Sequence, residues 1–181
     1  MATLWLTCGP PGSGKTTIAR RIEEERGAVR MTADEWLLRL WPEDPLGSHR
    51  SAIEPLQWEL TARLLRLGVN VVLDWGIWAR EERDTLRLAG RALGARVVLL
   101  YESVELVELQ RRVTARAAGA EHGVFAITSW MWAELERNWQ PPDAAELGLF
   151  DAPEGLAQTE PGVPVDRPCS ARVDSRLWIR V

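Results

Sequence analysis

Short apolar runs alternate with amphipathic stretches along most of the chain. Four runs have the length and aliphatic character of buried strands, and apolar positions at helical spacing follow each of them. The predicted strands cover residues 4–8, 28–31, 69–74 and 96–101. The predicted helices cover residues 15–26, 32–41, 55–67, 81–93, 105–118 and 128–139. Because strands that alternate with helices favour right-handed βαβ units, the pattern predicts an α/β fold with a three-layer, doubly wound parallel sheet.

Local signals refine the ends of these segments. Residues 32–35, Thr-Ala-Asp-Glu, form a capping box, in which the Glu35 side chain would bond back to the start of the helix. Pro55 either opens the third helix or kinks a longer one. The end of the chain is rich in proline and turn residues, and it offers one edge strand at residues 162–166. We therefore predict a core over residues 1–150 and a tail over residues 151–181.

The most specific signal is a glycine-rich segment between the first strand and the first helix. It completes the pattern G-x-x-x-x-G-K-[ST] of a phosphate-binding loop, for which a plain glycine turn is the alternative. Such a loop wraps phosphates with its backbone N–H groups. Lys15 would reach the β- and γ-phosphates of a nucleotide, and Thr16 would ligate Mg²⁺. The expected nucleotide contacts are Gly9, Pro10, Pro11, Gly12, Ser13, Gly14, Lys15, Thr16 and Thr17.

Two aspartates follow predicted strands at the edge of the sheet where doubly wound folds bind their ligands. Asp74 ends the strand over residues 69–74, where it would hold Mg²⁺ with Thr16 or, alternatively, only cap the next turn. Asp34 lies just beyond the second strand, in the first turn of the next helix. There it would orient an acceptor hydroxyl and take its proton, or merely complement the helix dipole.

The helix after the fourth strand carries three arginines, Arg111, Arg112 and Arg116. Their guanidinium groups would close over the triphosphate as a lid around residues 111–123, with Arg111 on the nucleotide. Gly119 and Gly123 would let this segment hinge. The alternative is a solvated basic face that pairs with Glu105 and Glu108.

Tryptophans cluster next to the two aspartates. Trp36 is two residues past Asp34, Trp75 follows Asp74, and Trp78 comes soon after. Together with Trp41, these rings would form a flat wall for a ring-bearing substrate, although core packing explains any single one.

Composition narrows the partners of such a site. The chain has 181 residues, a formal net charge of −4 and a pI near 5.4, which does not favour broad nucleic-acid binding. No apolar run reaches the ~18 residues of a membrane span. Cys8 and Cys169 form no C-x-x-C pair and no signal-like stretch precedes the first strand, so we expect a cytoplasmic protein.

These residues together resemble the short P-loop kinases of the AAA-type ATP-binding family over residues 2–150. The similarity lies in the loop, in Asp34 and its neighbours, in residues 71–76 and in the arginine segment. Chloramphenicol phosphotransferases, zeta-type toxins and the kinase domain of polynucleotide kinases are more distant relatives. The resemblance implies an adenylate-kinase-like P-loop NTPase core, ATP with Mg²⁺, a base at Asp34 and an arginine-bearing lid. Polynucleotide kinases usually have an arginine three residues after that aspartate, whereas this chain has Leu37, with Arg39 further on.

The sequence thus favours an ATP-dependent phosphotransferase that moves the γ-phosphoryl group to a hydroxyl of a small molecule of the antibiotic, nucleoside or sugar type. Lys15, Asp34 and either Arg112 or Arg116 are the expected catalytic residues. A kinase of polynucleotide 5′-hydroxyl ends and a nucleotide-dependent switch that hydrolyses ATP slowly are the alternatives. The identity of the acceptor, the choice of ATP or GTP and the oligomeric state stay open.

Overall fold

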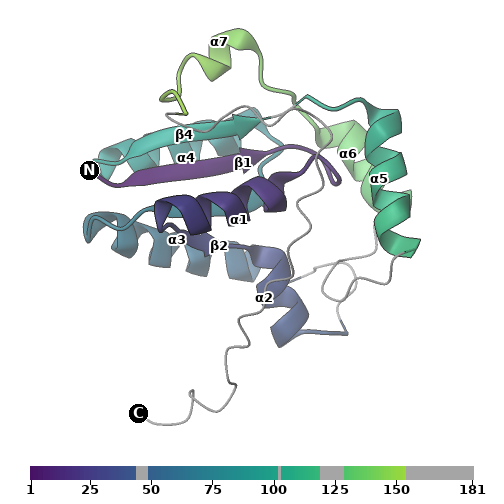
Figure 1. Cartoon of the computed structure of the whole chain (residues 1–181), viewed down its shortest axis with the longest axis horizontal. Helices are drawn as coiled ribbons and strands as arrows, with labels where there is room; N and C mark the ends of the chain where they lie inside the picture. The colour runs from purple at the N-terminus through teal and green to yellow at the C-terminus, as the bar shows by residue number, and fades with distance from the viewer. Residues whose placement is uncertain (44–48, 102, 119–128, 154–181) are drawn as a thin grey trace.

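The computed structural model describes residues 1–43, 49–101, 103–118 and 129–153 (Figure 1). Its strands are β1 (Thr3–Cys8), β2 (Val29–Met31), β3 (Val71–Gly76) and β4 (Arg96–Tyr101). Its helices are α1 (Lys15–Arg26), α2 (Ala33–Leu40), α3 (Arg50–Arg66), α4 (Arg80–Ala92), α5 (Leu106–Ala118), α6 (Ser129–Asn138) and α7 (Ala144–Leu147). Strands and helices alternate as the sequence predicts, and only the short α7 is unforeseen. None of the helices in these residues has the length and apolar character that a membrane crossing needs.

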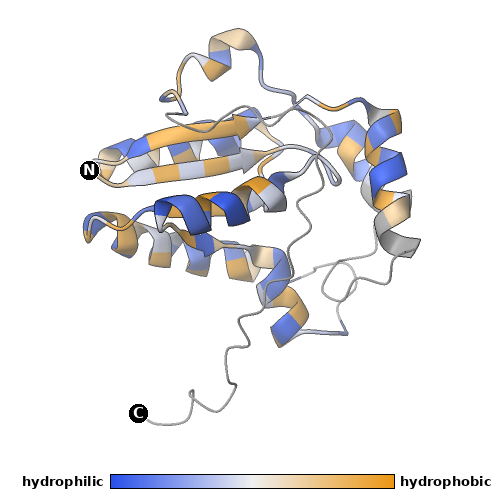
Figure 2. Cartoon of the chain, in the orientation of Figure 1, coloured by the Kyte–Doolittle hydropathy of each residue, from blue (hydrophilic) through white to orange (hydrophobic). Residues whose placement is uncertain are grey.

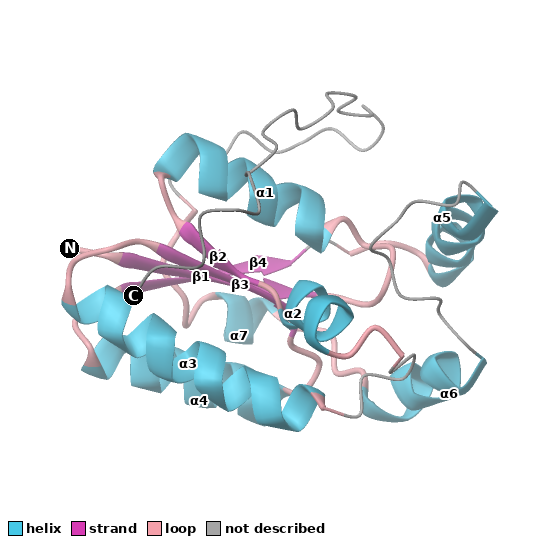
Figure 3. Ribbon diagram, turned by 90° about the horizontal axis from the view of Figure 1, so that it is seen from below, coloured by secondary structure: helices cyan, strands magenta, loops and turns pink. Residues whose placement is uncertain are grey.

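The strands form one parallel sheet in the order β2-β3-β1-β4. Parallel neighbours need crossover connections, and helices supply them on both faces. Figure 3 shows α1 on one face of the sheet and α3 and α4 on the other. The predicted three-layer, doubly wound α/β fold is therefore confirmed.

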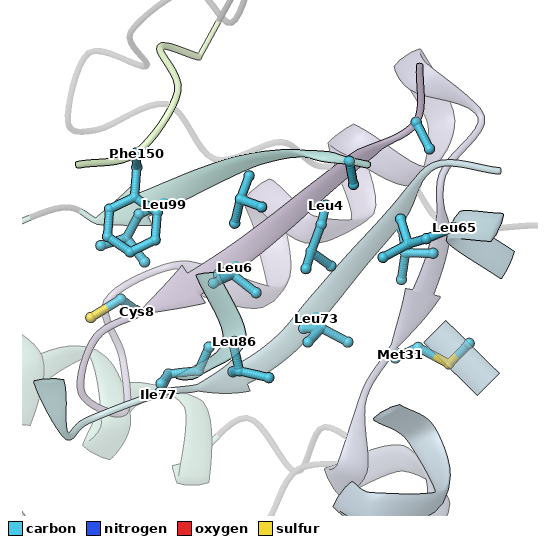
Figure 4. Close-up of a cluster of buried hydrophobic side chains, with 14 residues drawn as sticks. Leu4, Leu6, Cys8, Met31, Leu65, Leu73, Ile77, Leu86, Leu99 and Phe150 are labelled. Carbon is cyan, nitrogen blue, oxygen red and sulfur yellow. The ribbon is translucent and has the colours of Figure 1, made fainter. Parts of the chain in front are cut away.

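Both faces of the sheet are buried, because alternate residues of a strand point to opposite sides. Leu4 and Leu6 of β1 pack into the cluster that includes Leu86 of α4 (Figure 4). Trp5, between them, packs with Ile22 of α1 on the opposite face. Figure 2 shows the contrast between the largely apolar β4 and the hydrophilic residues along α1. Because helices cover both faces of the sheet, the loops that can bind a ligand lie at the ends of the strands.

Strand β3 begins and ends two residues later than predicted. The Asn70 side chain accepts a hydrogen bond from the Thr3 N–H (3.0 Å) and donates to the Arg26 carbonyl (3.1 Å), which holds Asn70 in the turn before the strand. At the other end Gly76 still pairs with the last residue of β1. Asp74 therefore lies inside β3, two residues before its end, and not at the end itself.

Helix α2 begins where the capping box predicted, but the box itself does not form. Thr32 is the residue before the helix, and its side chain makes no capping hydrogen bond. The Glu35 carboxylate instead accepts a hydrogen bond from Arg30 (2.8 Å). An ion pair with a neighbouring strand thus replaces the local bond that the sequence suggested.

Helix α3 contains Pro55 in its interior, so the longer of the two predicted helices is present. The leucine repeat that indicated this helix does not mark its buried side. Leu56 and Leu60 are 55% and 38% exposed, whereas Ile53 and Gln57 are buried. Gln57 belongs to the buried face because its side-chain oxygen accepts a hydrogen bond from the indole of Trp75 (2.7 Å).

The segment around α7 completes the core next to β4. The fully buried Arg83 of α4 pairs with Glu146 of α7 at 2.6 and 2.9 Å. Asp151 donates its N–H to the Val97 carbonyl (2.9 Å) and accepts from the Val97 N–H (2.8 Å). The edge strand expected at residues 162–166 lies outside the described residues.

Candidate active site

The phosphate-binding loop joins β1 to α1 and has the backbone geometry that its glycines allow. Gly12 and Gly14 have φ angles of 85° and 93°, which side-chain-bearing residues rarely adopt. Gly14 precedes the first turn of α1, and no side chain caps that helix. The Nζ of Lys15 donates to the Pro10 carbonyl at 2.7 Å, so the amine lies over the loop. Uncapped N–H groups at a helix start together with this amine favour an anion.

Asp74 reaches the same place from β3. Its side chain is only 3% exposed. Burial raises the pKa of Asp74, and the nearby Thr16 side chain, together with the charges of Arg30 and Lys15, partly opposes that rise. The structure thus brings Asp74 of β3 to Lys15 and Thr16 at the start of α1.

These groups fit a magnesium ion that is bound with a nucleotide. The described residues contain no cluster of three or more His, Cys, Asp or Glu side chains able to hold a metal alone. One hydroxyl and one carboxylate at the mouth of the loop are what Mg²⁺ takes from a protein when phosphates and water fill its other positions.

Gly76, which the sequence did not single out, shapes this site. Its φ is 85°, and a Cβ built on it would lie 3.0 Å from the Cε of Lys15. Its carbonyl also accepts a hydrogen bond from the Gly9 N–H (3.4 Å). The end of β3 therefore lies against the lysine stem, and its positive φ angle favours glycine at this position.

Asp34 lies at the same edge of the sheet as Asp74, and its negative charge contributes to the raised pKa of Asp74. The side chain is 53% exposed and forms an ion pair with Arg50 at the start of α3. Arg50 also pairs with Glu54 at 3.0 Å. The neighbourhood of the two aspartates follows from the pairing of β2 with β3, whereas Arg50 carries no local motif and was missed.

The predicted tryptophan wall is divided between two places. Trp36 and Trp75 are half-buried and pack against the hydrophobic core. Trp78 turns to the loop, where its indole N–H donates to the Gly9 carbonyl (3.3 Å). Contact of any of the three rings with a substrate stays a prediction.

Helix α5 packs directly on the loop. A Cβ on Gly12 would lie 3.1 Å from the Leu109 carbonyl oxygen and 3.2 Å from a methyl group of Val113. The arginines of this helix point elsewhere: Arg111 and Arg112 both pair with Glu108 at 2.7 Å, and Arg111 is 70% exposed. The side chain of Arg116, together with Gly119 and Gly123, lies outside the described part of the structure.

The model of a protein family described as an AAA domain matches residues 4–141. The chain belongs to this family. No curated protein shows significant sequence similarity to it.

Solved structures show the same fold at low identity. A candidate kinase from Chloroflexus aurantiacus is 17% identical over 78% of this chain and 82% of its own, with a TM-score of 0.60. Kti12 of Chaetomium thermophilum, in complex with ADP-AlF3, is 19% identical over 77% and 81%, with a TM-score of 0.57. A chain of the Pnkp1/Rnl/Hen1 RNA repair complex is 21% identical over 75% of this chain and 43% of its own, with a TM-score of 0.62. The P-loop fold that the motifs implied is thus confirmed for this AAA domain.

Proposed function

We propose that this AAA domain is an ATP-dependent phosphotransferase that moves the γ-phosphoryl group to a hydroxyl of a small molecule. The observation that carries the proposal is the meeting of Lys15, Thr16 and Asp74 at the mouth of the loop. Phosphoryl transfer needs little covalent chemistry from a protein, and catalysis consists mainly of positioning and charge stabilisation. Those three side chains provide both at one point.

Each group has a separate task in this scheme. The loop N–H groups and Lys15 hold the β- and γ-phosphates, and Thr16 and Asp74 hold Mg²⁺. When bound, Mg²⁺ neutralises charge that develops on the phosphate oxygens. Arg112 or Arg116, from a lid over residues 111–123, adds positive charge to the group in transfer.

Asp34 is the group we assign to the acceptor. It is half-exposed at the edge of the sheet, next to Asp74, so a hydroxyl can approach it from solvent. Arg50 contacts its Oδ1, which fixes the carboxylate, and Oδ2 is the oxygen we assign to the acceptor proton.

One observation favours a small acceptor over a polynucleotide 5′ end. Leu37 is fully buried with Ala33 and Ile53, so the position that would carry an arginine in polynucleotide kinases faces the core.

The test is ATP consumption by the Lys15→Ala variant and the wild type, with a panel of antibiotics, nucleosides, sugars and 5′-hydroxyl oligonucleotides. We expect acceptor-dependent turnover in the wild type and none in the variant, because no neutral side chain replaces the lysine charge. Arg21→Ala, which removes an exposed pair with Glu25 on α1, is the matched control and should keep full activity. Wild-type transfer by Lys15→Ala would refute the proposal, and ATP hydrolysis that ignores every acceptor would favour a nucleotide-dependent switch.

A further inference from the structure

Arg30 of β2 has a buried guanidinium group at the edge of the site. Its side chain is 10% exposed, and its three nitrogens face three different elements. Nε donates to Glu23 of α1 at 3.0 Å, and Nη2 donates to Glu35 of α2 at 2.8 Å. Nη1 lies 3.6 Å from Oδ2 of Asp74 in β3.

This arrangement is more than the burial of one charge requires. A buried guanidinium costs desolvation free energy, and hydrogen-bonded carboxylates compensate for it. Glu23 and Glu35 already supply two such carboxylates. Nη1 is nevertheless buried against Asp74 without a hydrogen bond of its own, a cost that a purely structural ion pair would avoid.

The three elements that Arg30 joins carry the proposed nucleotide, metal and acceptor groups. Helix α1 begins with Lys15 and Thr16, the first turn of α2 contains Asp34 beside Glu35, and β3 contains Asp74. The guanidinium is planar and presents its donors in a rigid fork, so it sets directions as well as charge. Arg30 thus contacts both Glu35 beside Asp34 and Asp74 itself.

We propose that Arg30 is a positioning residue for phosphoryl transfer, which fixes the carboxylate of Asp74 and, through Glu35, the turn that bears Asp34. The inference rests on the proposed function, because it takes from it the tasks of the two aspartates. Arg30 acts on the metal site through Asp74 and on the acceptor site through Glu35. It touches neither ligand, since Nη1 is enclosed.

Two measurements without catalytic turnover test this inference. The first is the ratio of ADP dissociation constants in EDTA and in Mg²⁺, obtained by calorimetry. The second is hydrogen exchange of residues 36–39, whose N–H groups are the first that the hydrogen bonds of α2 protect. In Arg30→Met we expect the ratio to fall ~10-fold or more, the usual scale for losing a partner of a metal ligand, and exchange to accelerate. Arg30→Lys should fold and keep the positive charge. Its ratio of dissociation constants should still fall, because one ammonium group cannot replace the forked donors of the guanidinium.

Single carboxylate variants separate positioning from simple loss of an ion pair. Glu35→Gln should speed exchange at residues 36–39 and leave the Mg²⁺ ratio near wild type. Glu23→Gln should change neither quantity, since it anchors only α1. The inference is overturned if both Arg30 variants keep the wild-type ratio and exchange, or if Glu23→Gln reproduces the Arg30→Met result.

Different experimental results would refute the proposed function. Wild-type transfer in Lys15→Ala would refute the phosphotransferase and leave both Arg30 measurements intact. If ADP affinity in the wild type ignored Mg²⁺, the metal assignment of Thr16 and Asp74 would be wrong, and the part of the Arg30 inference that acts through Asp74 would be overturned with it.

Discussion

The two sides of the phosphate loop are built differently. On the side of β2 and β3, the charged groups belong to different helices and strands and are held by contacts between these elements, as Arg30 shows with Glu23, Glu35 and Asp74. On the side of α5, Arg111 and Arg112 pair with Glu108, one turn away on the same helix. Arg30 and Asp74 on the first side are 10% and 3% exposed, whereas Arg111 on the second side is 70% exposed.

This difference separates side chains that the fold already orients before a nucleotide binds from side chains that can change partners. Contacts between elements are fixed once the sheet forms, so the direction of Asp74 is set by the fold. Pairs within one exposed helix turn contribute little to stability and are screened by salt. Arg112 can therefore exchange Glu108 for a phosphate at small cost, as a lid residue must.

The largest expected effect is that of Asp74→Asn on the buried side. The variant should lose the Mg²⁺ dependence of every nucleotide reaction, slow hydrolysis to water included, because the ion loses its protein carboxylate. Calorimetry of ATP binding with and without Mg²⁺ measures this loss. Asp84→Asn, which alters an aspartate that pairs with Arg87 on α4, should keep the full dependence. A variant at Asp74 that still responds to Mg²⁺ would remove that residue from the metal site.

Asp34→Asn should lower transfer to the acceptor by ~10²-fold or more, the usual scale for loss of a positioned base, and leave ATP affinity near wild type. Acceptor phosphorylation beside ATP calorimetry separates it from Asp74, because a metal ligand affects both quantities. Glu54→Gln is the control, since Glu54 shares Arg50 with Asp34 but is assigned no proton. Full transfer in Asp34→Asn would reduce Asp34 to a partner of the helix dipole.

On the exposed side, Arg112→Ala should lower turnover about tenfold or more, through lost charge stabilisation of the transferring group. Its melting temperature should match the wild type, because the pair with Glu108 is partly exposed and local. Arg137→Ala, which removes the corresponding exposed pair with Glu134 on α6, should change neither quantity. If Arg112→Ala lowered stability and not turnover, the arginine side would be a solvated helix face and no lid.

The same contrast explains what the sequence could predict. The loop, the order of strands and helices and the meeting of Lys15 with Asp74 follow from local patterns and from the geometry of parallel sheets. Arg30 and Arg50 could not be foreseen, because their partners come from other elements and no spacing rule connects them. Glu35 was misassigned for the same reason. The predicted cap is a bond within one helix, whereas the actual partner of Glu35 is Arg30, which belongs to β2.

The predicted tryptophan wall and the leucine repeat of α3 show a second limit of prediction from sequence. Hydrophobic spacing predicts that a helix exists, but it does not say which side is buried when a polar residue such as Gln57 belongs to the buried side. Gln57 is buried because its side-chain oxygen accepts a hydrogen bond from the Trp75 indole. Trp75 was itself predicted to belong to the wall of rings that contacts the substrate. Helix α7 was missed because four residues are too few to show a period.

The smallest expected effect concerns the titration of Glu108. Hydrogen bonds from Arg111 and Arg112 lower the pKa of this carboxyl from 4.5 to about 2. A lowered carboxyl pKa means that the pairs are fully formed above the ordinary value and are lost as the pH falls towards the lowered one. The arginines should therefore stay paired at pH 4, and NMR of the carboxyl carbon should show the midpoint well below 4.5 at low salt. Because the group is exposed, 1 M salt should return the midpoint towards its ordinary value, whereas the contacts of the enclosed Arg30 should be much less sensitive. A Glu108 midpoint that does not move with salt would show that the arginine side is as fixed as the carboxylate side, and the distinction between the two would fail.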